Sequence, residues 1–155
     1  MTLRIKLSNY GNSNFQKILG HNAAFLDSWN MLDDTLFSKS NLEPELIEQV
    51  RRSLAFINKC EYCMVKAGRP HFSKAQIRIS FAVAFAEIFA HDHLLIKDDH
   101  FNVLKEVFSD SEISELCAII SFISCSQKIG RIFNLSEEYQ PNRNTSMSEL
   151  LTKDR

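Results

Sequence analysis

The chain of 155 residues has the composition of one globular domain, with 45% apolar and 24% charged residues. Its formal net charge of −1 weighs against a nucleic-acid partner, which would require a basic excess. No run of apolar residues is long enough to span a membrane, so we expect no membrane partner. A polar stretch follows Lys6, where a secretory signal would need an apolar core, so we expect a reducing, cytoplasmic location.

The low content of turn-forming residues favours a helical fold. Four glycines and three prolines are too few for the many turns of a β-sandwich or β-barrel. Neither of the glycine-rich loops that bind nucleotide phosphates is present. We therefore predict an all-α fold, a compact bundle of about six helices.

Polar ends flank the predicted helical part of the chain. Residues 1–14 are expected to form an N-terminal arm, residues 15–135 the helical domain and residues 136–155 a polar tail. Apolar spacing predicts a first helix over residues 15–38. Pro44 favours the start of a second helix, because proline is well tolerated in the first turn.

Two capping-box sequences mark further helix starts, Ser73 with Gln76 and Ser109 with Glu112. A short helix is expected between them, over residues 96–108. The residues expected to face the core are Ile77, Phe81, Ala84, Phe85 and Ile88 in the earlier helix, and Ile113, Leu116, Ile119, Ile120, Ile123 and Ile132 in the later one.

Cys60-x-x-Cys63 is the most specific chemical feature of the sequence. We predict that it opens a short helix that ends at Gly68, where unpaired N–H groups and the helix dipole favour a thiolate. The spacing allows the two sulfurs to form a bridge across one turn, as a redox-active pair does. A thiolate attacks a peroxide or a disulfide, and the neighbouring thiol then resolves the product.

A zinc half-site is an alternative interpretation of the same motif, but the sequence offers it few further ligands. Cys117 and Cys125 are eight residues apart, a spacing that does not chelate, and we interpret them as small buried core residues. His91 and His93 fit a polar helix end better than a ligand pair. We therefore expect no bound metal or cofactor.

The twelve phenylalanines are expected mainly to form the core. An apolar pocket beside the cysteines, suited to a hydrophobic substrate, is the alternative interpretation for some of them. Glu48, twelve residues before Cys60, has the spacing of a surface ion pair with Arg52 when it is considered alone.

Together, Glu48, Cys60 and Cys63 and their flanking helices resemble the alkylhydroperoxidase D-like branch of the carboxymuconolactone decarboxylase family. The similarity covers roughly residues 15–135, including the segment LEPELIEQVRRSLAFINKCEYC at residues 42–63. The decarboxylase branch of the family generally lacks the cysteine pair, so the similarity is to the peroxidase branch.

The resemblance implies an all-helical homo-oligomer, a trimer or a hexamer, that acts as a thiol-dependent peroxidase in antioxidant defence. It implies that Cys63 reacts with the hydroperoxide, that Cys60 resolves it and that Glu48 starts a proton relay. An external dithiol protein is the expected electron donor. A carboxylate beside the thiols could accept their proton near neutral pH.

One position departs from the family pattern, because Ala67 stands where the family usually has a histidine. Three replacements are open: His71 from the following loop, which we favour; His91 or His93 from the next helix; or water with Tyr62. A weakened relay suggests an alternative function, a redox-sensing or binding module on the same fold.

Overall fold

The computed structural model describes residues 2–136. Over these residues the chain forms seven α-helices and one 3₁₀ turn, without a strand. The helices are α1 (Asn14–Leu19), α2 (Ala23–Ser38), α3 (Pro44–Ile57), α4 (Glu61–Ala67), α5 (Ile77–Asp92), α6 (Asp98–Lys105) and α7 (Asp110–Ile132), with the 3₁₀ turn η1 (His93–Leu95) after α5. The all-α prediction is confirmed.

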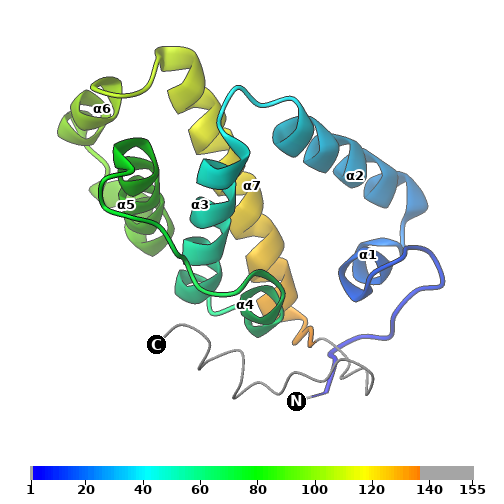
Figure 1. The fold of residues 1–155 in the computed structure, drawn as a ribbon. Helices are drawn as coiled ribbons and strands as arrows, with labels where there is room; N and C mark the ends of the chain where they lie inside the picture. Colours follow the sequence, from blue (N-terminus) through cyan, green and yellow to red (C-terminus); the bar gives the residue numbers. More distant parts are fainter. Residues whose placement is uncertain (1, 137–155) are drawn as a thin grey trace.

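Helices α3 and α7 run side by side through the centre of the molecule (Figure 1), and α5 packs against both. Helix α6 lies on the same side as α5, whereas α1 and α2 lie on the opposite side. Helix α4 contacts one end of both α3 and α7. The large aliphatic side chains that are fully buried at the centre are Leu46, Val50, Leu54, Leu104, Leu116, Ile119 and Ile120. Their removal from water is the main force that holds the helices together.

The prediction of one helix over residues 15–38 is wrong, because the chain breaks there into α1 and α2. Ser13 caps α1 and Asn22 caps α2, each through a side-chain oxygen that accepts a hydrogen bond from a first-turn N–H. A Cβ atom on Gly20 would lie 2.0 Å from the carbonyl oxygen of Tyr10. The break therefore occurs where the N-terminal segment, at Tyr10, passes close to the backbone of Gly20.

Helix α5 begins later than predicted and buries a different face. The backbone N–H of Ser73 donates to the side chain of Gln76 at 2.8 Å, but the helix begins only at Ile77. Ile77 is 53% exposed and Ala84 is also exposed, so the predicted stripe is wrong at these positions. The buried residues are Ile79, Ala82, Val83, Phe85 and Ala86. Because apolar residues lie all round this helix, their spacing does not identify the buried face.

Helix α7 follows its prediction closely. Ser109 and Glu112 form a complete capping box, and the predicted apolar stripe is buried except at Ile132. Ile132, the last residue of the helix, is 56% exposed.

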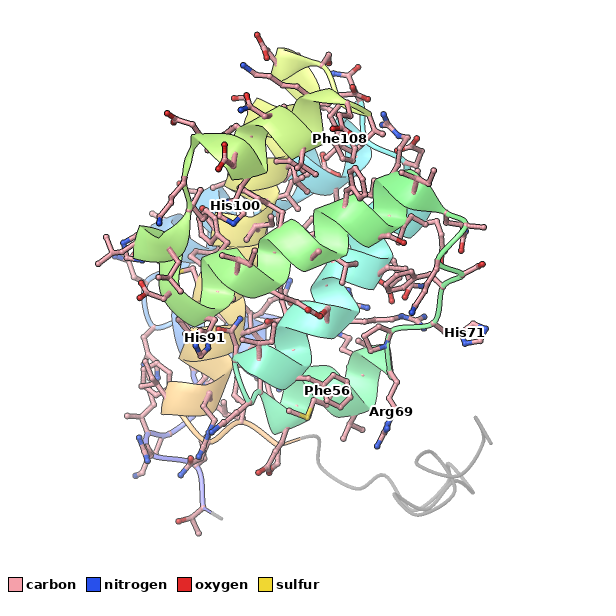
Figure 2. The ribbon with its side chains drawn as sticks, turned by 90° about the vertical axis from the view of Figure 1, so that its left-hand side faces the viewer. Phe56, Arg69, His71, His91, His100 and Phe108 are labelled. Carbon is pink, nitrogen blue, oxygen red and sulfur yellow. A yellow bond between two sulfur atoms is a disulfide. The ribbon has the colours of Figure 1, made fainter. Side chains whose placement is uncertain are left out.

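Arg78 joins the start of α5 to the starts of α3 and α7. Its guanidinium donates to Glu43 at 2.8 Å and to Glu112 at 2.7 Å, and it lies 4.4 Å from the ring centre of Phe108. The backbone N–H of Ser109 and then the Arg78 guanidinium lower the pKa of Glu112 to about 2. Figure 2 shows Phe108 at this end of the bundle.

The segment before α1 runs past the C-terminal end of α7. The backbone N–H of Arg4 donates to the carbonyl oxygen of Phe133 at 3.2 Å. The Arg4 guanidinium donates to the carbonyl oxygen of Ile132 at 2.8 Å. The predicted polar tail, residues 136–155, lies outside the described residues apart from Ser136. None of the helices described between residues 2 and 136 combines the length and apolarity needed to cross a membrane.

Candidate functional site

The Cys60–Cys63 pair lies at the start of α4, as predicted. Lys59 adopts a positive φ of 51°, at the turn from α3 into α4. Cys60 is the N-cap residue of α4, Cys63 lies in its first turn, and a disulfide joins their sulfurs across a Cα–Cα distance of 5.2 Å. Cys60 is fully buried, whereas Cys63 is only partly buried. Cys63 is therefore the cysteine that a small molecule can approach.

Gly130 on α7 provides the space that the buried cysteine occupies. A Cβ atom on Gly130 would lie 3.1 Å from the Cys60 sulfur and 4.0 Å from the Cys63 sulfur. Because 3.1 Å is closer than an ordinary van der Waals contact, even an alanine at this position would press on Cys60.

A pocket of about 240 Å³ opens beside Cys63, between α2 and the central helices. The two closest of its aromatic rings, Trp29 and Phe122, have centres 4.8 Å apart. The aromatic residues of its lining are Phe15, Trp29, Phe37, Tyr62 and Phe122. Three phenylalanines therefore line a pocket next to Cys63, in part as the alternative interpretation expected, but the lining also includes polar and charged side chains.

Gln127, a polar residue of the lining, is held by buried hydrogen bonds. Gln127 is 3% exposed, and its amide donates to the carbonyl oxygen of Arg51 at 3.0 Å and accepts from Asn58 at 2.9 Å. These bonds join α7 to α3 and its C-terminal cap, which fixes the position of the pocket relative to α4.

Glu48 lies on α3 between two arginines. Its carboxylate accepts two hydrogen bonds from Arg51, at 2.8 and 2.9 Å, and one from Arg52, at 2.7 Å. Burial raises the pKa of Glu48, but the hydrogen bonds and charges of the arginines outweigh it, so the pKa is lowered overall. The predicted pair with Arg52 is present, and Arg51 joins it.

Glu48 and Cys63 line two different pockets. Glu48 lines a neighbouring pocket of about 380 Å³ that also includes Asp33, Phe37 and Arg51. These last three residues line the Cys63 pocket as well, so the two pockets adjoin.

The histidines considered as relay groups lie outside the Cys63 pocket. His71 is exposed, and Figure 2 shows its side chain pointing away from the helices, although its backbone N–H donates to Gln49 at 2.7 Å. His91 is exposed near the C-terminal end of α5, and His93 is exposed in the 3₁₀ turn that follows. Of the groups proposed for the relay, Tyr62 is the one that lines the pocket.

Three charged residues of the pocket were missed by the sequence reasoning: Asp33, Arg51 and Lys66. The signal for Asp33 was its spacing, because Trp29, Asp33 and Phe37 follow one another at intervals of four along α2 and share one face. That face mixes a carboxylate with aromatic rings, so a search for an apolar stripe passes over it.

The remaining cysteines are more exposed than predicted. Cys117 is half-buried, and burial raises the pKa of its thiol. Cys125 is exposed, so its assignment to the core is wrong. Within the described part of the chain, no three His, Cys, Asp or Glu side chains gather in a way that could hold a metal ion.

No protein-family model matches the chain, and no curated protein matches it either. The fold is similar to the crystal structure of an uncharacterized peroxidase-related protein from Silicibacter sp. TM1040, with a TM-score of 0.70 and 19% sequence identity. The similarity covers 79% of this chain and 75% of that chain. At this identity it shows a related all-α fold and leaves the family resemblance of the sequence a prediction.

Proposed function

We propose that the protein is a thiol-dependent peroxidase and disulfide oxidoreductase that uses the Cys60–Cys63 pair to reduce hydroperoxides in antioxidant defence. The observation that carries this proposal is the asymmetry of the pair: Cys63 lines a pocket, whereas Cys60 is buried behind it. This arrangement fits one cysteine that meets the substrate and a second that resolves the product. The name of the structural neighbour, peroxidase-related protein, agrees with the proposal.

In this function Cys63 attacks the hydroperoxide and becomes a sulfenic acid, while the substrate leaves as an alcohol or water. Cys60 then attacks the Cys63 sulfur, releases water and closes the disulfide. A dithiol donor protein reopens the disulfide by exchange, so the protein needs no bound cofactor. The aromatic walls favour an organic hydroperoxide with an apolar group over hydrogen peroxide.

A redox sensor on the same fold is the second candidate. Glu48 is engaged by Arg51 and Arg52, and Ala67 replaces the histidine of the family pattern. A dithiol with a weak proton relay would be oxidised slowly, and to the disulfide only once, without a catalytic cycle. Steady turnover with a dithiol donor supports the enzyme, whereas a single oxidation that changes the size of the assembly supports the sensor.

We also propose that the protein forms a homo-oligomer, a trimer or a hexamer. Helix α2 presents apolar side chains to solvent, since Phe25 is 50%, Met31 68% and Leu32 47% exposed. Such a surface is typical of an interface. Leu32→Glu is expected to lower the molar mass in light scattering, whereas Ser114→Glu, at an exposed polar position of α7, leaves it unchanged.

Hydroperoxide consumption with a dithiol donor tests the enzymatic proposal. Cys63→Ser is expected to abolish turnover, and Cys60→Ser to stop the cycle at the sulfenic acid. Cys125→Ser is the matched control, because that cysteine is exposed on α7 and lies outside the pair. Unchanged turnover in Cys63→Ser would refute the proposal.

A further inference from the structure

The proposed reaction needs a group that moves a proton, because the departing alkoxide must be protonated. Glu48 is poorly suited to this role, since two arginines stabilise its ionised form. The imidazoles of His71, His91 and His93 do not line the pocket. The structure thus leaves the proton transfer to other residues around Cys63.

Asp33 occupies the required place. It lines the Cys63 pocket, and no other described residue of that lining carries a carboxylate. Its side chain makes no hydrogen bond or ion pair with another described residue, in contrast to Glu48. A carboxylate without a fixed partner can accept and release a proton at lower cost than one held by two guanidinium groups.

We propose that Asp33 carries the proton between Cys63 and the hydroperoxide. This inference rests on the proposed peroxidase function and names the group that replaces the missing histidine. It follows from the presence of Asp33 and Cys63 in the lining of one pocket, to which α2 contributes the first and α4 the second.

The charges around Asp33 keep it available for this role. Asp33 is exposed to solvent on one side. Desolvation by the protein on its other side raises its pKa most, the neighbouring carboxylate of Asp34 raises it further, and the Lys66 ammonium lowers it. The lining that α1 and α7 contribute is uncharged. The ionisable and charged groups that face Asp33 from the other helices are Arg51 and Glu48 of α3, and Tyr62, Cys63 and Lys66 of α4.

The Cys63 thiol gives its proton to the Asp33 carboxylate as its sulfur attacks the outer peroxide oxygen. A sulfur–oxygen bond forms, the oxygen–oxygen bond breaks, and the alkoxide takes the proton from Asp33 and leaves as the alcohol. Cys60 then displaces water from the sulfenic acid, so the dithiol supplies both electrons. An external dithiol restores the pair.

The test compares two reagents on the reduced protein in a Cys125→Ser background. Cumene hydroperoxide needs a proton on its leaving oxygen, whereas an activated aromatic disulfide (Ellman's reagent) releases a thiolate that needs none. Asp33→Asn is expected to slow the reaction of Cys63 with the hydroperoxide by about a hundredfold. Its reaction with the disulfide stays equal or becomes faster, because removal of a nearby negative charge favours the thiolate.

Asp34→Asn is the matched control, since it removes the same charge from the next residue of α2, outside the pocket lining. It is expected to keep the plateau rate with hydroperoxide and to move the acid limb of the pH profile to lower pH, because Asp34 raises the pKa of Asp33. Lys66→Met moves that limb to higher pH, because Lys66 lowers that pKa.

Two results would overturn the assignment of Asp33. One is an Asp33→Asn protein that reacts with cumene hydroperoxide as fast as the parent, and the other is an equal loss with both reagents, which indicates a structural role. A parent protein that reacts with the hydroperoxide no faster than free cysteine would instead refute the peroxidase function itself, and the role of Asp33 with it. Tyr62→Phe shows whether the phenol shares the proton transfer: a loss as large as that of Asp33→Asn would transfer the role to Tyr62.

Discussion

The sulfur of Cys60 lies 3.1 Å from the place where a Cβ atom on Gly130 would stand. The absence of a side chain at Gly130 on α7 thus leaves room for the sulfur of Cys60, the buried half of the disulfide. The contact joins the start of α4 to the longest helix of the bundle. The position of the cysteine pair depends on this packing as well as on the local sequence of α4.

Gly130→Ala is therefore expected to destabilise the oxidised protein by about 1–3 kcal/mol, the usual cost of overpacking a core. Elsewhere in a helix the same change stabilises, because alanine loses less backbone entropy than glycine on folding. Urea unfolding of the oxidised protein measures the difference. Ser114→Ala, at an exposed position of α7, is the control for helix propensity. A Gly130→Ala protein that is more stable than the parent would show that the space around Cys60 is not restricted.

The contact of Arg78 with Glu112 is expected to make the free energy of unfolding depend on pH. The folded state lowers the pKa of Glu112 from its ordinary value of 4.5 to about 2, mainly through the Ser109 backbone and then through Arg78. A carboxyl whose pKa is lower in the folded state stabilises that state above its unfolded pKa. This contribution is lost as the pH falls from about 4.5 towards about 2.

We expect Arg78→Met to reduce the free energy of unfolding by about 1.5–3 kcal/mol at neutral pH, because Arg78 also binds Glu43 and contacts Phe108. The loss is expected to shrink in acid, where the carboxylates of the parent protein are protonated. Denaturant titrations at several pH values measure both effects, with Lys105→Met as the control for an exposed and weak ion pair. An equal loss at every pH would contradict the ionic part of this account.

Trp29 offers a direct report on the pocket, since it is the one tryptophan of the chain. Its ring lines the pocket and lies 4.8 Å from Phe122. Cumyl alcohol, the product of cumene hydroperoxide reduction, is expected to bind among these rings and to shift the Trp29 emission in a saturable way. Phe122→Ser is expected to weaken this binding several-fold, whereas Phe101→Ser, whose ring packs on Phe85, leaves it nearly unchanged. An emission that does not respond to the alcohol would contradict an apolar substrate pocket.

Those parts of the fold that depend on neighbouring residues could be predicted from the sequence. The start of α3 at Pro44, the complete box of Ser109 and Glu112, and the short helix after Cys60 are all encoded within one turn. The break between α1 and α2 was not predicted, because it involves the passage of Tyr10 against Gly20. Such an approach leaves no periodic signal in the sequence.

In the candidate site, too, local spacing predicts some features, whereas others depend on the fold. Cys60, Cys63 and the pair of Glu48 with Arg52 follow from spacing alone. The pocket could not be placed in advance, because its walls come from α1, α2, α3, α4 and α7. The spacing of Asp33 places it on one face of α2 with Trp29 and Phe37, but its connection to Cys63 requires the three-dimensional arrangement.

The most direct test of the account is the mass of the cysteine peptides of the reduced protein before and after one equivalent of cumene hydroperoxide. Cys60 and Cys63 are expected to lose two hydrogens together, while Cys117 and Cys125 stay as free thiols. The reaction should be faster than that of free cysteine, because the Asp33 carboxylate lines the same pocket as Cys63 and is proposed to carry the proton. Oxidation of the exposed Cys125 before the pair, or no reaction beyond the rate of free cysteine, would contradict a redox-active dithiol.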